Sequence, residues 1–319
     1  MATTASDLSL ANIERAARVI DPVFLNSPQF ADEQLNAELG SHVLLKVETA
    51  NPIRSFKGRG ADFKMQSLEP GRHVVCASAG NFGQAIAYAG RSRGLKVTVF
   101  AATTVNPVKR ARMVGFGAEV QIIGSDFDAA KEFAVEFASR HPSRVFIEDG
   151  DDAAICEGAG TIAIELEREG HLDTVVVPVG DGALICGIAT WLKAKAPTTR
   201  VVGVCPSGAP ALADSWRAGK AVTTEPTGTI ADGLAVRVPV PIAVERLRAL
   251  VDDIVLVDDE SMVRAMRLAA TTLGLVLEPS GAAGLAAIAN HRFPGQRLAT
   301  VLTGSNIHPE LFARLCQPG

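Results

Sequence analysis

Long apolar segments are missing from this 319-residue chain: no stretch approaches the roughly 18 apolar residues of a membrane span. The first residues, MATTASDLSL, also lack a basic segment followed by an apolar core, so they do not look like a secretion signal. Charges are nearly balanced, with a net charge of −4, and the basic residues are scattered. These absences predict a cytoplasmic protein that binds neither membranes nor nucleic acid.

Cysteine is scarce and shows no metal-ligand pattern. The five cysteines are widely spaced, with no C-x-x-C pair and no histidine at the spacing of a metal site. We expect no metal, and we expect the thiols to be reduced and mostly buried; they are Cys76, Cys156, Cys186, Cys205 and Cys316.

The chain does contain a regular alternation of two patterns. Short runs rich in β-branched residues predict strands buried on both faces, and they begin at His42, His73, Lys96, Val145, Thr174, Val201 and Ala299. Amphipathic stretches between the runs predict helices at 81–94, 106–117, 128–140, 160–170 and 184–197. The segment 218–241, rich in proline, glycine and threonine, predicts a long loop. This alternation predicts an α/β fold with parallel sheets covered by helices on both sides.

In such folds, reactive groups gather where strands end and helices begin. The first of these junctions is ETANPIRSFKGRGADFKM, in which Lys57 follows a strand and a turn and opens a helix. A lone lysine there is usually just solvated. A partly desolvated lysine keeps enough neutral amine to attack an aldehyde, and Phe56, Gly58 and Gly60 could provide the apolar setting. Lys57 is therefore a candidate catalytic residue.

The second junction is ASAGNFGQA, residues 77–85. Ser78 is expected to cap the following helix, Gly80 permits an unusual backbone angle, and Asn81 offers an amide in the first turn. The segment reads either as a plain capped turn or as a carboxylate site, because N–H groups and a serine hydroxyl at a helix start bind anions.

The third junction is the turn Gly180-Asp181-Gly182-Ala183-Leu184, which follows the strand VVVPV. Such a turn usually binds a phosphate or a dinucleotide. A dinucleotide fold would close its next strand with an acidic residue, but that strand ends at Cys205. A single phosphate on the N–H groups of residues 180–184 fits better, provided that the Asp181 side chain faces away.

The fourth junction is VLTGSNIHPE, where Thr303, Ser305 and Asn306 follow the last strand. Hydroxyl groups at a strand end are common, so the pattern alone is weak. A neutral hydroxyl facing a heteroaromatic nitrogen would tune a cofactor differently from a carboxylate, because it does not enforce protonation of the ring.

The order of these four motifs resembles that of the serine/threonine dehydratase (threonine ammonia-lyase) branch of fold-type II pyridoxal-phosphate (PLP) enzymes. GAGTIAIEL from Gly158, TIADGLAV from Thr229 and EPSGAAGLAA from Glu278 strengthen the resemblance, which spans nearly the whole chain. It implies a homodimer that eliminates water and ammonia from a β-hydroxy amino acid, such as threonine or serine, to give a 2-oxo acid.

The resemblance also implies a role for each motif. Lys57 would hold the cofactor pyridoxal 5'-phosphate as a Schiff base and, once released, take the α-proton. Phe56 would pack on the cofactor ring, and Thr303, rather than Ser305, would face the pyridine nitrogen. The cofactor phosphate would rest on Gly180, Asp181, Gly182, Ala183 and Leu184. The substrate carboxylate would bind to Ser78, Ala79, Gly80 and Asn81, with Asn81 also placed near the phenolic oxygen of the cofactor.

The implied architecture has two lobes, each with a mainly parallel sheet flanked by helices. Residues 1–67 and 149–319 would form a large PLP-binding lobe, and residues 68–148 a small inserted lobe. In the family, the cofactor lies between the lobes, and the small one closes over the substrate.

Some positions depart from the family pattern. Phe82 stands where dehydratases often have histidine. Asp181 and Ala183 stand in a phosphate loop that is nearly all glycine in the family. The identity of the substrate is therefore not predicted. Cys205 stands where metal-dependent members carry a glutamate, and we predict no divalent-cation site there. Ala79 replaces a serine of the eukaryotic-type serine racemases, so racemisation should be poor.

Three alternatives remain open from the sequence. A β-replacement or threonine-synthase-like enzyme would share the fold but add a nucleophile. A binding protein could keep the PLP fold without turnover, although the retention of Lys57 argues against this. An NAD-dependent oxidoreductase is the least favoured, because the strand ending at Cys205 lacks the acidic residue.

Overall fold

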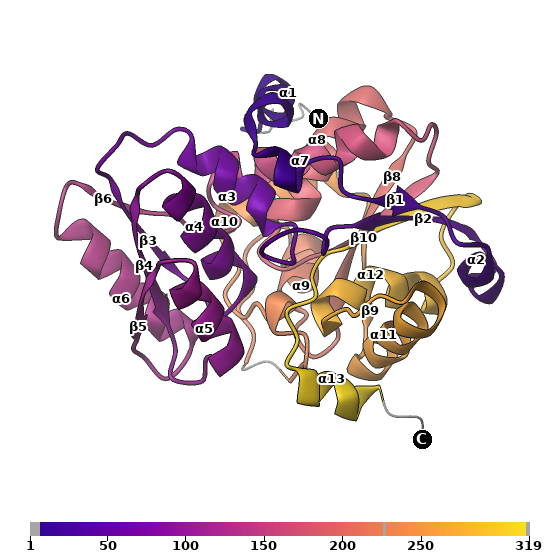
Figure 1. Ribbon diagram of the computed structural model, residues 1–319. Helices are drawn as coiled ribbons and strands as arrows, with labels where there is room; N and C mark the ends of the chain where they lie inside the picture. The colour runs from indigo at the N-terminus through magenta and orange to yellow at the C-terminus, as the bar shows by residue number, and fades with distance from the viewer. Residues whose placement is uncertain (1–6, 226–227, 317–319) are drawn as a thin grey trace.

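The computed structural model describes residues 7–225 and 228–316, which form two sheets covered by helices (Figure 1). The larger sheet has the strand order β1-β2-β10-β7-β8-β9, and the smaller has the order β5-β4-β3-β6. All neighbouring strands are parallel except β1 and β2. The predicted α/β class with mainly parallel sheets is thus confirmed. The strands are β1 Gln29–Phe30, β2 His42–Val47, β3 His73–Ala77, β4 Lys96–Ala101, β5 Glu119–Ile122, β6 Arg144–Phe146, β7 Thr174–Pro178, β8 Arg200–Pro206, β9 Asp253–Val257 and β10 Arg297–Leu302.

All seven predicted strands are present, and three further strands were not predicted. β1 has only two residues, β5 is a largely exposed edge strand, and β9 is an edge strand beside β8, so none stood out as a long buried run. The expectation of burial on both faces is wrong for β6, which is half-buried. This strand, Arg144–Phe146, is also shorter than the run VFIED that predicted it.

The five predicted helices are present, and the one predicted at 160–170 begins earlier because Asp152 caps it. The helices are α1 Leu10–Val19, α2 Glu33–Leu39, α3 Lys57–Met65, α4 Asn81–Ser92, α5 Pro107–Gly115, α6 Phe127–Ser139, α7 Ala153–Glu167, α8 Ala183–Lys195, α9 Ala211–Ala218, α10 Pro241–Leu250, α11 Asp259–Leu273, α12 Pro279–Asn290 and α13 Pro309–Leu315. Two short 3-10 helices are η1 Pro22–Phe24 and η2 Asp232–Leu234. In the described part of segment 218–241, η2 is the only helical turn before α10, as a loop requires.

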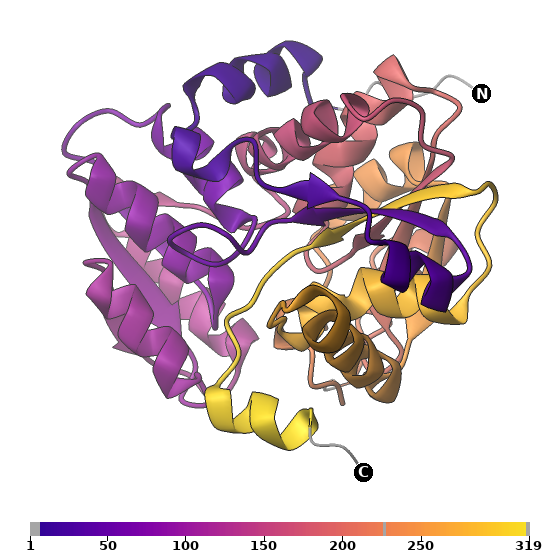
Figure 2. The same ribbon diagram turned by 45° about the vertical axis from the view of Figure 1, so that its right-hand side comes forward.

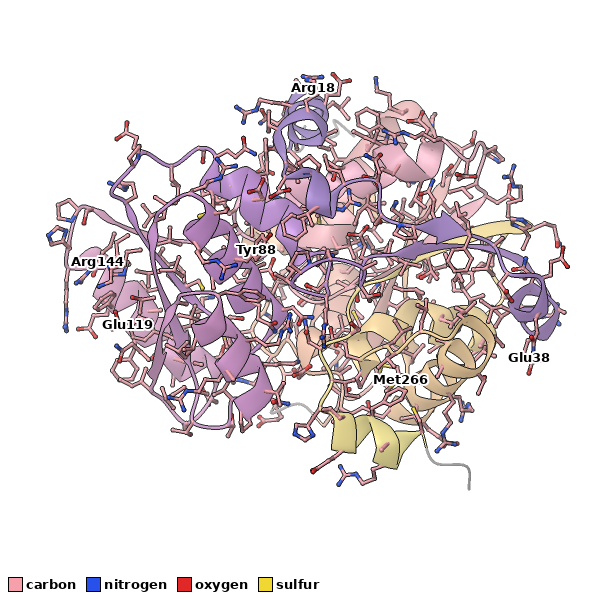
Figure 3. All side chains as sticks on the ribbon, viewed as in Figure 1. Arg18, Glu38, Tyr88, Glu119, Arg144 and Met266 are labelled. Carbon is pink, nitrogen blue, oxygen red and sulfur yellow. The ribbon has the colours of Figure 1, made fainter. Side chains whose placement is uncertain are left out.

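Helices cover both sheets, as Figures 1 and 2 show. The smaller sheet packs against α4 and α6, while α12 packs on the larger sheet with α11 outside it. Exposed charged side chains such as Arg18 and Glu38 project from the rim, whereas Met266 of α11 is fully buried (Figure 3). Within the described residues, no helix has the length and apolar character needed to cross a bilayer.

The smaller sheet and the helices α4 to α6 fall within residues 68–148, the predicted small lobe. The lobe boundaries themselves stay a prediction. Residues 1–6 and 317–319 of the predicted large lobe, and residues 226–227 of the predicted loop, lie outside the described part of the chain.

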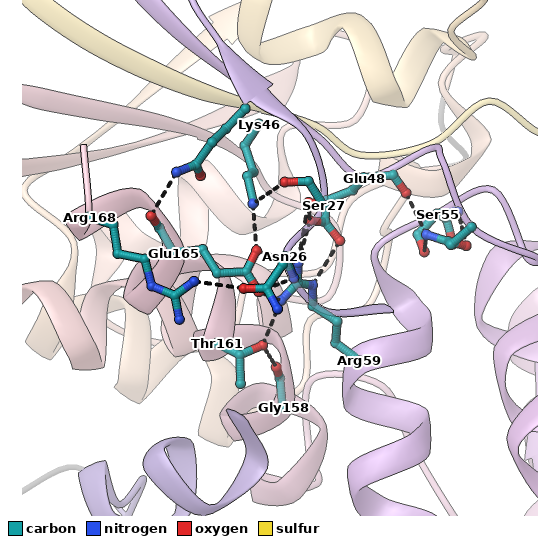
Figure 4. Close-up of polar contacts among 12 residues, drawn as sticks. Asn26, Ser27, Lys46, Glu48, Ser55, Arg59, Gly158, Thr161, Glu165 and Arg168 are labelled. Atoms are coloured by element: carbon teal, nitrogen blue, oxygen red, sulfur yellow. Dashed lines mark hydrogen bonds and ion pairs between the residues drawn. The ribbon is translucent and has the colours of Figure 1, made fainter. Parts of the chain in front are cut away.

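Helix α3 lies between α4, which covers the smaller sheet, and α7. Close packing and a buried ionic network fix its position. A Cβ atom at Gly60 would lie 2.5 Å from the Ile155 carbonyl oxygen, so the backbone of α3 lies directly against α7. Arg59, fully buried on α3, donates from Nη2 to Glu48 Oε1 at 2.8 Å and from Nη1 to Glu165 Oε1 at 2.6 Å (Figure 4). Lys46 Nζ lies 2.5 Å from Glu165 Oε2.

The network keeps its carboxylates charged although they are buried. Burial alone would raise the pKa of Glu165, but hydrogen bonds and charges from Arg59 and Lys46 outweigh it and hold this pKa below its ordinary value. Arg59 therefore ties the first turn of α3 to the end of β2 and to α7. That turn begins with Lys57.

We predict that Arg59→Met lowers the free energy of unfolding by about 3–5 kcal/mol, because two carboxylates lose their buried cation. Urea unfolding followed by circular dichroism measures this change. The control is Arg140→Met, which removes an exposed pair with Glu136 and should cost less than about 1 kcal/mol. Equal effects of the two substitutions would contradict the structural role given to Arg59.

Candidate active site

A pocket of about 840 Å³ gathers residues from both halves of the molecule. It lies where β3, β7 and β10 end, which is where parallel α/β sheets place their ligands. Every residue to which the resemblance assigns a cofactor or substrate role lines this pocket: Phe56, Lys57, Ser78, Ala79, Gly80, Asn81, Gly180, Asp181, Gly182, Ala183, Leu184 and Thr303. The structure therefore brings the four motifs to one place, while their individual roles stay predictions.

Lys57 is the first residue of α3, and its side chain is only 14% exposed. Its Nζ lies 4.7 Å from the centroid of the Phe56 ring and 6.0 Å from that of Phe82. The amine is thus partly desolvated by aromatic rings, as the neighbouring residues suggested. It also forms an ion pair with Asp149, which follows β6 and was not predicted. The second carboxylate oxygen of Asp149, Oδ1, is buried without a hydrogen-bond partner.

The turn after β3 differs in one detail from the prediction. Gly80, not Ser78, is the N-cap of α4, because the helix begins at Asn81. The Ser78 hydroxyl still accepts from Gly80 N–H at 3.1 Å and from Gly83 N–H at 2.8 Å, so it orders the helix start from two residues further back. Gly80 has φ −160° and ψ −121°, which lies outside both the helical and the extended regions, so the prediction of an unusual backbone angle is confirmed. The N–H groups of Asn81 and Phe82, the first two residues of α4, have no acceptor within the helix and are available to an anion.

The turn after β7 needs glycine at two positions. Gly182 has φ +94° and caps α8, a conformation that disfavours side chains. At Gly180, a Cβ atom would lie 2.6 Å from the Gly233 carbonyl oxygen. Between them, Asp181 is half-buried and belongs to the residues that line the pocket. Burial and the nearby Asp149 carboxylate raise the pKa of Asp181 to about 7, which weakens its negative charge.

Thr303 is buried at the end of β10 and donates from Oγ1 to the Ser280 carbonyl at 3.3 Å. Its own carbonyl accepts from Phe56 N–H at 3.1 Å, which joins the last strand to the residue before Lys57. Ser305 lines a different pocket, of about 610 Å³, together with Arg54 and Phe312. The geometry therefore favours Thr303 over Ser305 as the hydroxyl facing a ligand in the main pocket.

A cluster that links the two halves was missed by the sequence analysis. Lys109 of α5 is buried, and its Nζ lies 2.6 Å from Asp232 Oδ2 and 3.6 Å from Glu278 Oε2. Asn81 donates from Nδ2 to Glu278 Oε1 at 2.5 Å and accepts from Asn306 Nδ2 at 2.9 Å. The sequence marked Asp232 and Glu278 only as parts of family-like stretches, and Lys109 only as part of a helix.

Two further ion pairs lie among the residues that line the pocket. Arg237, in the segment before α10, pairs with Asp128 in the first turn of α6, and Lys131 of α6 pairs with Glu148. These ion pairs connect α6 to the loop 218–241 and to the segment that follows β6. In the described part of the chain, no cluster of three or more histidine, cysteine, aspartate or glutamate side chains could hold a metal ion.

Comparison with known proteins gives a consistent picture. The family model described as "Pyridoxal-phosphate dependent enzyme" matches residues 20–304. L-threonine dehydratase biosynthetic IlvA of Escherichia coli (strain K12) is 34% identical over 284 residues, which cover 86% of this chain and 55% of that protein. The chain thus matches about half the length of that relative.

Two further relatives match over most of both chains. L-threonine ammonia-lyase of Thermotoga maritima is 32% identical over 317 residues, covering 98% of this chain and 79% of that protein. The crystal structure of the T.th. threonine deaminase superposes with a TM-score of 0.88 at 35% identity, covering 94% of this chain and 99% of the other.

We predict that Lys109→Met destabilises the protein by about 3–5 kcal/mol at pH 8, because Glu278 then lacks its buried cation. Burial raises the pKa of Glu278, so lowering the pH protonates this carboxyl and removes part of the cost. The destabilisation should therefore be clearly smaller at pH 5, as urea unfolding at both pH values would show. Lys96→Met, which removes an exposed pair with Glu119, is the control and should be nearly neutral at both pH values. A pH-independent loss in Lys109→Met would contradict this account of the cluster.

Proposed function

Because the chain belongs to the pyridoxal-phosphate dependent enzyme family, we propose that it eliminates water and ammonia from a β-hydroxy amino acid of the threonine or serine type and so releases a 2-oxo acid. The observation that carries the proposal is the position of Lys57. Lys57 is the first residue of helix α3 and lines the pocket. The N-termini of α4 and α8 and the residue Thr303 line the same pocket.

The residues present fit the cofactor. An aldehyde needs an accessible amine, which Lys57 supplies, and a phosphate needs N–H groups free of side chains, which the turn 180–184 supplies through Gly180 and Gly182. The Thr303 hydroxyl is proposed to face the ring nitrogen and the Phe56 ring to stack on the cofactor ring, since both line the pocket. When bound, pyridoxal phosphate supplies a ring that accepts the electron pair left when a bond at the substrate α-carbon breaks.

Lys57 is the base in the proposed reaction. Once the substrate amine has replaced it, its Nζ is free to take the α-proton, and the pairing with Asp149 keeps the amine within the pocket. The rings of Phe56 and Phe82 keep water away from the amine, which limits its exchange of protons with solvent.

The substrate carboxylate is proposed to bind at Ser78, Ala79, Gly80 and Asn81. The N–H groups at the start of α4 and the Asn81 amide provide the donors, and the Ser78 hydroxyl holds the turn in shape. The small lobe, 68–148, is proposed to close over the substrate. Lys109 and Asp128 lie on that lobe and pair with carboxylate and guanidinium groups of the other, so these ion pairs would hold the closed form.

The alternative within the same family is β-replacement, in which a nucleophile adds to the dehydrated substrate. A panel of β-hydroxy amino acids assayed for 2-oxo acid release, with and without a thiol, separates the two. Elimination predicts the same release in both cases, with ammonia in equal amount. Consumption of the thiol at the expense of the 2-oxo acid would favour the replacement reaction.

We further propose that the enzyme works as a homodimer in the cytoplasm. The resemblance to the dehydratase branch supports the homodimer, and the sequence composition supports the cytoplasmic location. Light scattering after size-exclusion chromatography would give the mass of the particle in solution.

We predict that Lys57→Ala reduces turnover by about 10²–10⁴-fold or more, because both the attachment point of the cofactor and the proposed base are lost. Borohydride reduction followed by peptide mapping should tag Lys57 in the unchanged protein and no residue in the variant. Lys64→Ala is the matched control, since Lys64 lies on the same helix, pairs with Asp152 and does not line the pocket. Unchanged turnover in Lys57→Ala, or a tag on another lysine, would refute the assignment.

A further inference from the structure

Asp149, in the segment that follows β6, contacts Lys57 inside the pocket. Its Oδ2 pairs with Lys57 Nζ, and the two side chains are only 9% and 14% exposed. Its other carboxylate oxygen, Oδ1, is buried and has no hydrogen-bond partner among the described residues. A buried oxygen of this kind favours a donor, since leaving it without one costs free energy. Asp149 thus contacts the proposed base through one oxygen and has a second oxygen left for a hydrogen bond to a ligand.

The backbone around Asp149 is held on both sides. Before it, Ile147 N–H donates to a carbonyl of β3 at 2.9 Å. After it, the buried Arg246 donates to the Gly150 carbonyl at 2.8 Å and to the Asp151 carbonyl at 3.0 Å. Gly150 has φ +82°, and a Cβ atom there would lie 2.2 Å from a carbonyl oxygen of the turn after β7, so only glycine fits. These contacts give the carboxyl group a defined position beside Lys57.

The other acidic side chains of the pocket are placed differently. Four of them form ion pairs with basic side chains other than Lys57, and these are Asp128, Glu148, Asp232 and Glu278. Asp126 caps α6 and accepts from Ala129 N–H at 2.9 Å. Across residues 7–225 and 228–316, no carboxylate other than that of Asp149 contacts the Lys57 amine. Asp149 is thus the acidic group that can exchange a proton with Lys57 directly.

The proposed elimination needs an acid close to its base. Lys57 takes the proton from the substrate α-carbon, while the β-hydroxyl has to gain a proton, because it leaves far more readily as water than as hydroxide. A carboxyl group in contact with the base can supply this second proton and then take one back from the base. Both residues would then return to their starting state after each turnover.

We propose that Asp149 is the general acid of this reaction, which donates a proton to the departing β-hydroxyl and recovers one from Lys57. The inference rests on the proposed function and adds a second catalytic residue to it. Oδ2 faces the base, and Oδ1 is the oxygen available to the hydroxyl.

Atoms and protons balance over one turnover. Lys57 attacks the aldehyde as a neutral amine, so its ammonium first gives a proton to Asp149, and the aldehyde oxygen leaves as water. The substrate amine then replaces Lys57, which is again a neutral amine and takes the α-proton. The electron pair of the broken C–H bond forms the Cα–Cβ double bond as the Cβ–O bond breaks, and the hydroxyl leaves as water with the Asp149 proton.

The ammonium of Lys57 and the carboxylate of Asp149 that result are the ion pair found in the structure. Transfer of one proton across this pair restores the neutral amine, which displaces the product, and the protonated carboxyl. A half-turn of the carboxyl group exchanges its two oxygens. No oxidant or further reactant is needed.

The test compares two leaving groups. Chloride leaves without a proton, so 3-chloroalanine needs Lys57 but no acid, whereas serine needs both, and the two substrates give the same 2-oxo acid. Asp149→Asn keeps the shape of the side chain but is not an acid. It should lower the turnover of serine by about 10²–10⁴-fold and that of 3-chloroalanine by less than about tenfold. If threonine is the better substrate, threonine and 2-amino-3-chlorobutanoate are compared in the same way.

Two readouts besides turnover separate a catalytic role from a structural one. Borohydride should still tag Lys57 in Asp149→Asn to the same extent as in the unchanged protein, because the attachment point is intact. In deuterated water, this variant should return serine with deuterium at the α-carbon, because Lys57 still removes the α-proton while the hydroxyl stays. Asp214→Asn, which removes an exposed carboxylate paired with Arg217, is the control and should match the unchanged protein throughout.

Equal losses with serine and 3-chloroalanine, or an unchanged turnover of serine, would overturn the inference and leave the proposed function intact. An unchanged protein that releases no 2-oxo acid from any β-hydroxy amino acid would contradict the proposed function itself. If Asp149→Asn does not fold, as judged by circular dichroism, Asp149→Ala takes its place, and the same difference between the two substrates decides.

Discussion

The position of one helix turn governs the whole pocket. Lys57 is useful only if its amine faces the ends of β3, β7 and β10, and its backbone is held there by Arg59, whose guanidinium is fully buried between Glu48 and Glu165. A hydrophobic side chain could fill this space, but it could not bind two carboxylates from different elements at defined angles. The ionic network therefore gives the helix start its direction as well as its stability.

Parallel strands supply the second constraint. Because the carboxyl ends of β3, β7 and β10 point toward the same pocket, three turns that are far apart in the chain deliver their free N–H groups and hydroxyls to one place. The helices that follow add favourable partial charge for anions. In the proposed function, the substrate carboxylate at one helix start and the cofactor phosphate at the other would fix the ligand at two ends, with the Lys57 amine between them.

Much of this arrangement was predictable because it is local. Four of the buried runs end in turns of glycine and polar residues, so the seven strands and the four junctions that contribute to the pocket were predicted from the sequence. Partners that meet only in three dimensions were not: Asp149 is 92 residues from Lys57, and Lys109 is 123 residues from Asp232. Short or exposed edge strands such as β5 also lack a hydrophobic pattern, and the capping role of Ser78 was misplaced because its hydroxyl acts from two residues before the helix cap.

The strand order of the larger sheet has a consequence for biosynthesis. β10 lies between β2 and β7, so a central strand of this sheet is translated after all the other strands in the described residues (Figure 2). The smaller sheet can assemble during translation, since all its strands lie between His73 and Phe146. The frame around Lys57 cannot, because Phe56 and Ser55 bond to Thr303 and Gly304. A nascent chain is therefore unable to build the frame around Lys57 until β10 and the turn after it have been translated.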